Sequence, residues 1–290
     1  MTPKPPAVSE IRRVVRQALQ EDVGPGDCTT RAIVRPGDRL QAVVYAQARG
    51  VLAGVPMVRE VYRQLDRRVR VQAFKTDGSS VKPGDRLLRL QGPAGPILTG
   101  ERTALNFLGC LSGIATQTAT YVRALKGTGT QVWDTRKTVP GLRQFAKYAV
   151  RAGGGNNHRH GLYDAVLIKD NHVALAQGIR EAIRRTRRTL GKRVPIVVEA
   201  ENLEQVGEAL AGRADVILID NMSGHTLARA MRMIRGRAKT EVSGGLTLRS
   251  AVAAAKLGAD RVSVGALTHS AAWLPLHLEV ETTPASRGRG

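Results

Sequence analysis

The middle of this 290-residue chain carries a group of side chains that are cationic or can become so: Arg136, Lys137, His158, Arg159 and Lys169. Arginine can bind a carboxylate or phosphate through two parallel hydrogen bonds, and each charged hydrogen bond contributes about 1.5–3 kcal/mol. The group is therefore suited to two or more carboxylates or to a pyrophosphate. His158 and His160 could instead suggest zinc, but two histidines without a third ligand do not make a convincing site, and we predict no zinc there.

Two carboxylates, Glu199 and Asp220, stand where the apolar segments 195–199 and 215–220 end. Carboxylate oxygens are hard ligands that suit Mg²⁺, which a protein holds with few groups of its own while phosphate or hydroxyl oxygens complete the shell. We therefore expect Glu199 and Asp220 to contribute to a Mg²⁺ site, directly or indirectly, beside a sugar phosphate.

Small residues follow two further apolar segments: Ser243, Gly244 and Gly245 in one case and Gly265 in the other. Glycines let backbone amides approach a terminal phosphate, and a following helix N-terminus adds a favourable dipole. Each feature alone could be a helix cap, a surface ion pair or a turn. Their common position after successive apolar segments favours one shared site.

These side chains need a framework of parallel strands that end on one edge. Six short, mostly apolar segments alternate with helical segments, which is typical of parallel strands covered on both faces. Right-handed crossovers place all their C-terminal ends on one rim, where barrel enzymes carry their active sites. Six strands are fewer than the eight of a complete barrel, so we expect an incomplete or irregular one. The predicted strands are 131–134, 165–169, 195–199, 215–220, 240–243 and 261–265.

The first hundred residues have a different pattern, with an opening helix followed by strands and turns such as Pro83-Gly84-Asp85. From Thr99, apolar residues recur at helical spacing and predict a long helix that links two domains. We expect an N-terminal α/β sandwich domain over 1–108 and an α/β-barrel catalytic domain over 109–268, with 269–290 packing back on the first domain.

Composition limits the class of protein. No apolar run is long enough for a membrane span and no secretory signal is visible, so we expect a soluble cytoplasmic protein. The two cysteines, Cys28 and Cys110, fit buried reduced thiols. The net charge of +21 leaves nucleic-acid binding open, but aromatic residues make up only 3% of the chain and no nucleic-acid motif is present, so this is the weaker interpretation. We expect the arginine-rich run 184–188 to be a solvated helix face.

Several longer segments resemble the decarboxylating quinolinate phosphoribosyltransferases, also called nicotinate-nucleotide pyrophosphorylases (carboxylating). The resemblance runs in order from about Val8 to about Val280. The segments are EDVGPGDCTT from Glu21, GERTALNFLGCLSGIATQT from Gly100, DTRKTVPGLR from Asp134, KYAVRAGGGNNHRHGLYDAVLIKDNH from Lys147, DVILIDNMS from Asp215 and EVSGGLTL from Glu241.

The resemblance implies a type II phosphoribosyltransferase fold: an α/β sandwich domain followed by an irregular open barrel. It implies a homodimer, or a higher oligomer, in which Arg102 reaches the partner's active site; an Arg102–Glu101 surface pair is the alternative. Arg136, His158 and Arg159 would hold the quinolinate carboxylates. Lys137 and Lys169 would serve a carboxylate or pyrophosphate.

By the same resemblance, Glu199 and Asp220 would lie by the ribose hydroxyls and Mg²⁺, and the backbone at Ser243, Gly244, Gly245 and Gly265 would hold the 5-phosphate. The implied catalytic residues are Lys137, Lys169, Glu199 and Asp220. The implied reaction joins quinolinate to phosphoribosyl pyrophosphate and releases pyrophosphate and CO₂, leaving nicotinate mononucleotide for NAD synthesis.

Three other functions stay open from the sequence. A paralogous phosphoribosyltransferase on the same fold would act on nicotinate or another small acid. A lyase would form a Schiff base at Lys169. A basic protein without catalysis would bind nucleic acid.

Overall fold

The computed structural model describes residues 3–191 and 193–281. The described residues form two compact units. The first contains 3–117, 139–154 and 271–281, and the second contains 118–138 and 155–270. Residues 282–290 of the segment expected to pack back on the N-terminal domain lie outside the described part of the chain.

The first unit is built on a four-stranded antiparallel sheet in the order β12-β1-β5-β3. The strands are β1 (Arg39–Ala46), β3 (Arg70–Ala73), β5 (Arg86–Pro93) and β12 (Leu276–Glu281). The C-terminal strand β12 pairs with β1, so that Val44 lies opposite Leu278. A two-stranded sheet of β2 (Gly50–Val51) and β4 (Ser80–Val81) completes the strands of this unit.

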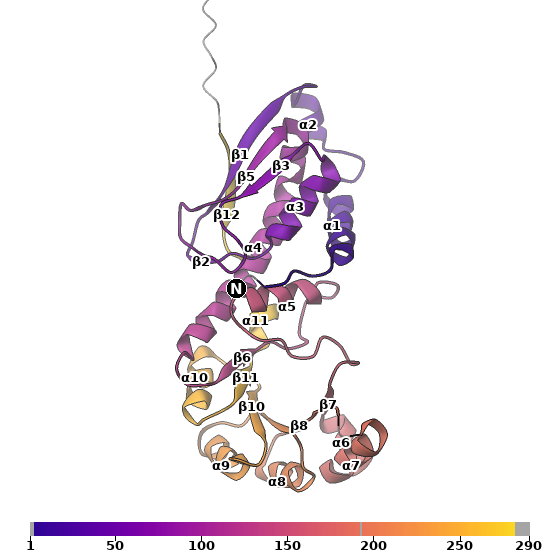
Figure 1. The fold of residues 1–290 in the computed structure, drawn as a ribbon, viewed down its shortest axis with the longest axis vertical. Helices are drawn as coiled ribbons and strands as arrows, with labels where there is room; N and C mark the ends of the chain where they lie inside the picture. The colour runs from indigo at the N-terminus through magenta and orange to yellow at the C-terminus, as the bar shows by residue number, and fades with distance from the viewer. Residues whose placement is uncertain (1–2, 192, 282–290) are drawn as a thin grey trace, which may run out of the picture. The chain divides into compact units, whose positions relative to one another are not determined.

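The first unit also contains helices, several of which bury an apolar face; Figure 1 shows where they lie in the ribbon. The described helices are α1 (Val8–Val23), α2 (Cys28–Ile33), α3 (Val55–Leu65) and α5 (Arg143–Ala152). On α1 the buried residues Ile11, Val14, Val15 and Leu19 recur every three or four positions, as a helix with one core-facing stripe requires. The helix α4 (Ala94–Ala124) contributes its first 24 residues, 94–117, to this unit and its remainder to the second.

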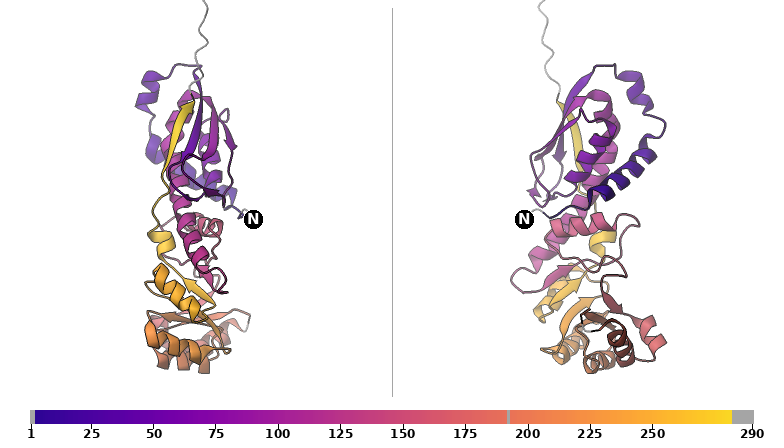
Figure 2. Two further views of the ribbon diagram at one scale, coloured as in Figure 1. Left: turned by 90° about the vertical axis from the view of Figure 1, so that its left-hand side faces the viewer. Right: turned by 45° about the vertical axis from the view of Figure 1, so that its right-hand side comes forward.

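The second unit is a curled sheet of six parallel strands in the order β6-β11-β10-β9-β8-β7, with helices on its outer side (Figures 1 and 2). The strands are β6 (Gln131–Trp133), β7 (Val166–Ile168), β8 (Ile196–Ala200), β9 (Val216–Asp220), β10 (Lys239–Ser243) and β11 (Arg261–Ser263). The helices are α6 (Asp170–Ala176), α7 (Ile179–Leu190), α8 (Leu203–Ala211), α9 (Gly224–Ile234), α10 (Leu248–Lys256) and α11 (Ala266–His269). All six predicted strands and the α/β fold class are confirmed.

The barrel is open, because the edge strands β6 and β7 have no ladder between them in the described residues. Within the described residues, the segment that follows Gly153, Gly154 and Gly155 contributes one isolated bridge, in which Asn156 pairs with Trp133. The expectation of an incomplete barrel is therefore confirmed.

The inward positions of the strands change from apolar to charged along the chain direction. Val197 precedes Glu199 on β8, and Val216 and Leu218 precede Asp220 on β9. Since alternate residues of a strand face the same side, the apolar residues form a cluster inside the barrel and the carboxylates lie at the C-terminal rim. This alternation is what brings the predicted site residues together.

Two expectations are wrong in detail. The long helix begins at Ala94 rather than at Thr99, since Pro96 falls in its first turn, where proline is tolerated. Cys28 is exposed, because it opens the surface helix α2, and Cys110 is half-buried, so neither is the buried residue that was expected. Both cysteines are free thiols.

No helix in the described residues is long and apolar enough to cross a membrane.

Candidate active site

A cavity of about 370 Å³ lies at the C-terminal ends of the barrel strands. Eight of the residues singled out in the sequence line it: Arg136, Lys137, His158, Arg159, Lys169, Glu199, Asp220 and Ser243. Thr135, Leu167, Leu218, Glu241 and Ser263 complete the lining. The second unit alone supplies all of these residues.

The acidic side of the cavity holds three carboxylates from two neighbouring strands. Glu199 on β8, Asp220 on β9 and Glu201 just beyond β8 each offer an oxygen, and these oxygens lie within 4.8 Å of one another. Burial and the charge of Glu199 raise the pKa of Asp220, and nearby Lys169 and Lys137 only partly offset them. Crowded like charges of this kind fit a divalent cation.

Lys169 closes the acidic side. It follows β7, the strand next to β8, and its Nζ lies 2.6 Å from Glu199 Oε2. The backbone N–H of Lys169 donates to His172 Nδ1 at 3.0 Å, which fixes the start of α6. This ion pair holds the lysine amine at the carboxylates.

Two arginines make the cationic side. Burial and the charge of Arg136 lower the pKa of Arg159, so the two guanidinium groups repel one another across a partly buried space. Arg159 Nη1 also donates to the carbonyl of Ala165 at 3.1 Å. An anion with more than one carboxylate would relieve this repulsion.

A buried carboxylate holds the segment that carries His158 and Arg159. Asp134, which is fully buried, accepts from the backbone N–H of His158 at 2.6 Å and from Asn157 Nδ2 at 2.8 Å. These bonds tie the segment to the end of β6 across the open side of the barrel. Asp134 itself is not among the residues that line the cavity and instead supports two of its neighbours, Asn157 and His158.

The loop after β10 is shaped by close backbone packing. Gly244 has φ 91°, and a Cβ there would lie 2.6 Å from the backbone nitrogen of Asn221. Asn221 Nδ2 in turn donates to Asp220 Oδ2 at 2.7 Å. The loop therefore requires glycine at this position and is coupled to the acidic side of the cavity.

Comparisons with known proteins decide the family. The family model of the C-terminal domain of quinolinate phosphoribosyl transferase matches residues 114–279, and that of the N-terminal domain matches residues 27–112. The chain belongs to the quinolinate phosphoribosyltransferase family.

Relatives match this family member over nearly their whole length. It is 42% identical to the probable nicotinate-nucleotide pyrophosphorylase (carboxylating) of Bacillus subtilis, and the match covers 93% of each chain. The corresponding protein of Mycobacterium leprae is 41% identical, with 93% of this chain and 96% of the relative covered.

Solved structures agree in fold. The nicotinate-nucleotide pyrophosphorylase of Francisella tularensis gives a TM-score of 0.90 at 37% identity, covering 97% of this chain and 99% of that one. Human nicotinic acid phosphoribosyltransferase gives a TM-score of 0.62 at 14% identity, covering 93% of this chain and 74% of that one, and shares the fold only.

Four residues predicted for this family member lie outside the cavity lining. Gly244, Gly245 and Gly265 are not among the lining residues, although a Cβ at Gly265 would lie 3.3 Å from Lys137 Cδ. Arg102 belongs to the first unit, is exposed, and has no ion pair with Glu101 among the described residues.

Sequence reasoning missed four residues at or beside the cavity: Thr135, Glu201, Glu241 and Ser263. Glu201 could have been found, since it stands two positions after Glu199 and alternation places both on one side. Glu241 gave a weaker signal, because a charged residue in the middle of a short apolar strand can also face outward.

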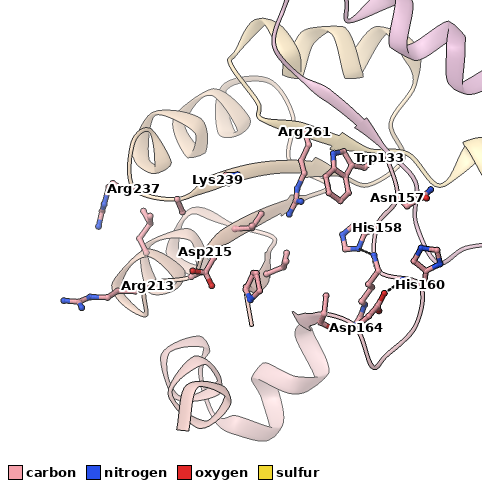
Figure 3. A pocket seen from close by; sticks show the side chains of 18 of the residues that line it. Trp133, Asn157, His158, His160, Asp164, Arg213, Asp215, Arg237, Lys239 and Arg261 are labelled. Carbon is pink, nitrogen blue, oxygen red and sulfur yellow. Dashed lines mark hydrogen bonds between the residues drawn. The ribbon is translucent and has the colours of Figure 1, made fainter. Parts of the chain in front are cut away.

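A second cavity, of about 1080 Å³, lies at the opposite, N-terminal ends of β8, β9 and β10 and extends to the open side of the barrel (Figure 3). Exposed Arg213 and Arg237 point away from it, and Arg261 lies beside Trp133 at its edge (Figure 3). His158 and Arg159 line both cavities. The smaller cavity holds the predicted acidic residues Glu199 and Asp220 and is the candidate active site.

Proposed function

We propose that this chain transfers the phosphoribosyl group of 5-phosphoribosyl 1-pyrophosphate to quinolinate with decarboxylation, which gives nicotinate mononucleotide, pyrophosphate and CO₂ for NAD synthesis. The observation that carries the proposal is the division of one cavity into an arginine side and a carboxylate side. The arginine side suits a dicarboxylate, and the carboxylate side suits the ribose and the Mg²⁺ of phosphoribosyl pyrophosphate.

The arginine side accounts for binding and orientation. Arg136 and Arg159 neutralise the quinolinate carboxylates, so that the ring nitrogen can approach the anomeric carbon.

The bond from that carbon to pyrophosphate breaks with its electron pair going to the leaving group. Lys137 and Lys169 stabilise the negative charge that develops there.

The carboxylate side favours the positive charge that develops on the ribose. Glu199 and Asp220 supply negative charge where the oxocarbenium character appears, and the interaction is stronger in the transition state than with neutral ribose. After transfer, the 2-carboxylate leaves as CO₂, and the electron pair stays on the ring carbon next to the quaternised nitrogen. A proton from water completes the product.

We propose Mg²⁺ as the cofactor, held by Glu199, Glu201 and Asp220. The three crowded oxygens and the raised pKa of Asp220 support the choice of a cation at this position. Bound there, it would supply charge neutralisation for the pyrophosphate.

We propose a cytoplasmic homodimer in which Arg102 completes the site of the partner. The exposed position of Arg102 in the first unit and the lack of an ion pair with Glu101 in the described residues support this role. The free thiols of Cys28 and Cys110 are compatible with a reducing compartment.

The competing functions are less well supported. A nicotinate transferase would need to neutralise one substrate carboxylate, whereas Arg136, Arg159 and Lys137 offer more positive charge than that. A Schiff-base lyase needs a free amine, whereas Lys169 Nζ is engaged in an ion pair with Glu199. Nucleic-acid binding is not favoured by the run on α7, where Arg184 and Arg185 pair with Glu181.

The test is CO₂ release from carboxyl-labelled quinolinate, measured with and without phosphoribosyl pyrophosphate and Mg²⁺. Release that requires all three components supports the proposal. No release, with turnover of nicotinate instead, would replace it by the paralogous activity.

A further inference from the structure

A buried carboxylate that the catalytic scheme does not use lies under the arginine side of the cavity. Glu241 is the middle residue of β10, its side chain is 0% exposed, and it lines the cavity with Ser243 of the same strand. Its register partners are Arg261 on β11 and Leu218 on β9. An unpaired carboxylate at such a position would be strongly destabilising, so its partners indicate its role.

Glu241 is paired on both sides. Arg261 Nε lies 2.7 Å from Glu241 Oε2, and His158 Nε2 lies 3.2 Å from Oε1. Arg261 is itself held over the ring of Trp133, with its guanidinium carbon 4.5 Å from the ring centroid (Figure 3). Burial raises the pKa of Glu241, but the hydrogen bond and charge of His158 and the charge of Arg261 outweigh it, so the carboxyl stays ionised.

The imidazole of His158 is engaged at both nitrogens by the protein. Nδ1 accepts from the backbone N–H of Arg159 at 3.0 Å, and Nε2 faces Glu241. The backbone N–H of His158 donates to buried Asp134. These contacts hold both the ring and the backbone of His158 in place.

We propose that Glu241 is a positioning residue for the dicarboxylate substrate, and that it acts through His158: the pair fixes the backbone of Arg159 so that this guanidinium meets the substrate. His158 then supports the arginine side through its contacts with Glu241 and with the backbone of Arg159. The proposal rests on the proposed function, because it assigns a role in binding quinolinate.

Three variants test the coupling: Glu241→Gln, His158→Asn and the two combined. Asparagine keeps an acceptor near the Nδ1 position and removes the contact with Glu241. We expect each single change to raise the KM for quinolinate by about 10–100-fold, as changes to supporting residues do, with smaller effects on kcat and on the KM for phosphoribosyl pyrophosphate. The double variant is expected to be no worse than the poorer single one, because both changes break the same link.

The opposite results would overturn the proposal. A wild-type KM in Glu241→Gln, or losses that multiply in the double variant, would mean that His158 and Glu241 act independently. If Glu241→Gln does not fold, Glu241→Asp replaces it in the comparison of single and double variants. Aspartate keeps the charge and shortens the reach, and the expected results are the same. Glu204→Gln on the exposed start of α8 is the matched control and should behave as wild type.

Failure of the proposed function is recognised separately. Wild-type protein that releases no CO₂ would reject the reaction before any variant is compared. Calorimetric titration with quinolinate alone then measures binding without turnover. The dissociation constants of the single and double variants, compared in the same way, test the positioning role by itself.

Discussion

At the scale of single residues, the candidate site works by crowding like charges on each of its sides. Burial and the charge of Arg136 lower the pKa of Arg159, and burial with Glu199 raises the pKa of Asp220. Each side is therefore improved by a ligand of opposite charge, an anion on one and a cation on the other. The ion pair of Lys169 with Glu199 partly balances the acidic side.

The raised pKa of Asp220 predicts a pH dependence. If activity needs ionised Asp220, kcat/KM falls on the acid side as the pH drops through this pKa, above the ordinary value of about 3.9 for an aspartate. Glu199→Gln removes the repulsion, so the acid limb should move to lower pH even though the rate is reduced. A pH–rate profile of both proteins checks this, and an acid limb that stays in place or moves up would contradict it.

Glu201 predicts a change in metal requirement. Glu201→Gln leaves Glu199 and Asp220 in place but removes one oxygen of the three, so the Mg²⁺ concentration for half-maximal activity should rise by about tenfold or more. Activity should also be lost on chelation and return with added Mg²⁺. The matched control is Glu204→Gln, and an unchanged Mg²⁺ titration in Glu201→Gln would exclude Glu201 as a ligand.

At the scale of elements, side chains from distant segments hold the ends of helices and loops. Asp77 accepts from the backbone N–H groups of Gly54 at 2.9 Å and Val55 at 3.1 Å, and so caps the start of α3. Tyr148 on α5 donates to the same carboxylate. This contact helps to explain why residues 139–154 belong to the first unit although their neighbours in sequence belong to the second.

Asp77→Ala should therefore destabilise the first unit by about 1–3 kcal/mol, since it leaves buried donors without an acceptor. Urea unfolding measures the loss. Glu10→Ala, which removes an exposed ion pair with Arg13, should cost about 1 kcal/mol or less. Equal losses in the two variants would show that Asp77 is not a structural cap.

Gly244→Ala tests the loop after β10. The new Cβ would clash with Asn221, which holds Asp220, so kcat/KM should fall by about 10–100-fold while the protein stays folded. Gly258→Ala is the matched control, because Gly258 also has positive φ but a Cβ added there would meet nothing beyond its chain neighbours within 4 Å. A similar loss in both variants would point to backbone strain rather than to the contact with Asn221.

At the scale of the whole molecule, the proposal of a shared site makes activity depend on two chains. Arg102→Ala should be inactive, although its cavity residues, which all lie in the second unit, are unchanged. Lys169→Ala should also be inactive, although its Arg102, in the first unit, is unchanged. Mixing the two after dissociation and reassociation should restore roughly a quarter of wild-type activity, because half of the dimers are mixed and each has one complete site.

The size of the assembly is measured by sedimentation in the same samples. A monomer, or a mixture that stays inactive while mixed dimers form, would contradict the shared site. Lys169→Ala mixed with Asp220→Ala is the matched control, since both changes lie in the second unit and no mixed dimer has a complete site.

The high net charge is a property of the whole surface. Part of it is balanced locally, as in the pairs of Arg184 and Arg185 with Glu181 on α7. The low affinity for nucleic acid expected from the sequence stays a prediction.

The sequence alone determined the strands, the barrel class and most of the cavity lining. Short apolar segments that end in Lys169, Glu199 or Asp220 are enough, because parallel strands with right-handed crossovers must place such ends on one rim. Local pattern carries this information, and the structure follows it to within two residues at each strand end.

Only the tertiary structure decided which charged groups meet. The pairing of Glu241 with His158 and Arg261 joins residues that lie on three separate segments, and the register between β10 and β11 sets it. The same holds for Asp77 with Tyr148. Such contacts depend on strand order and on the direction of each side chain, and local spacing does not encode either of these.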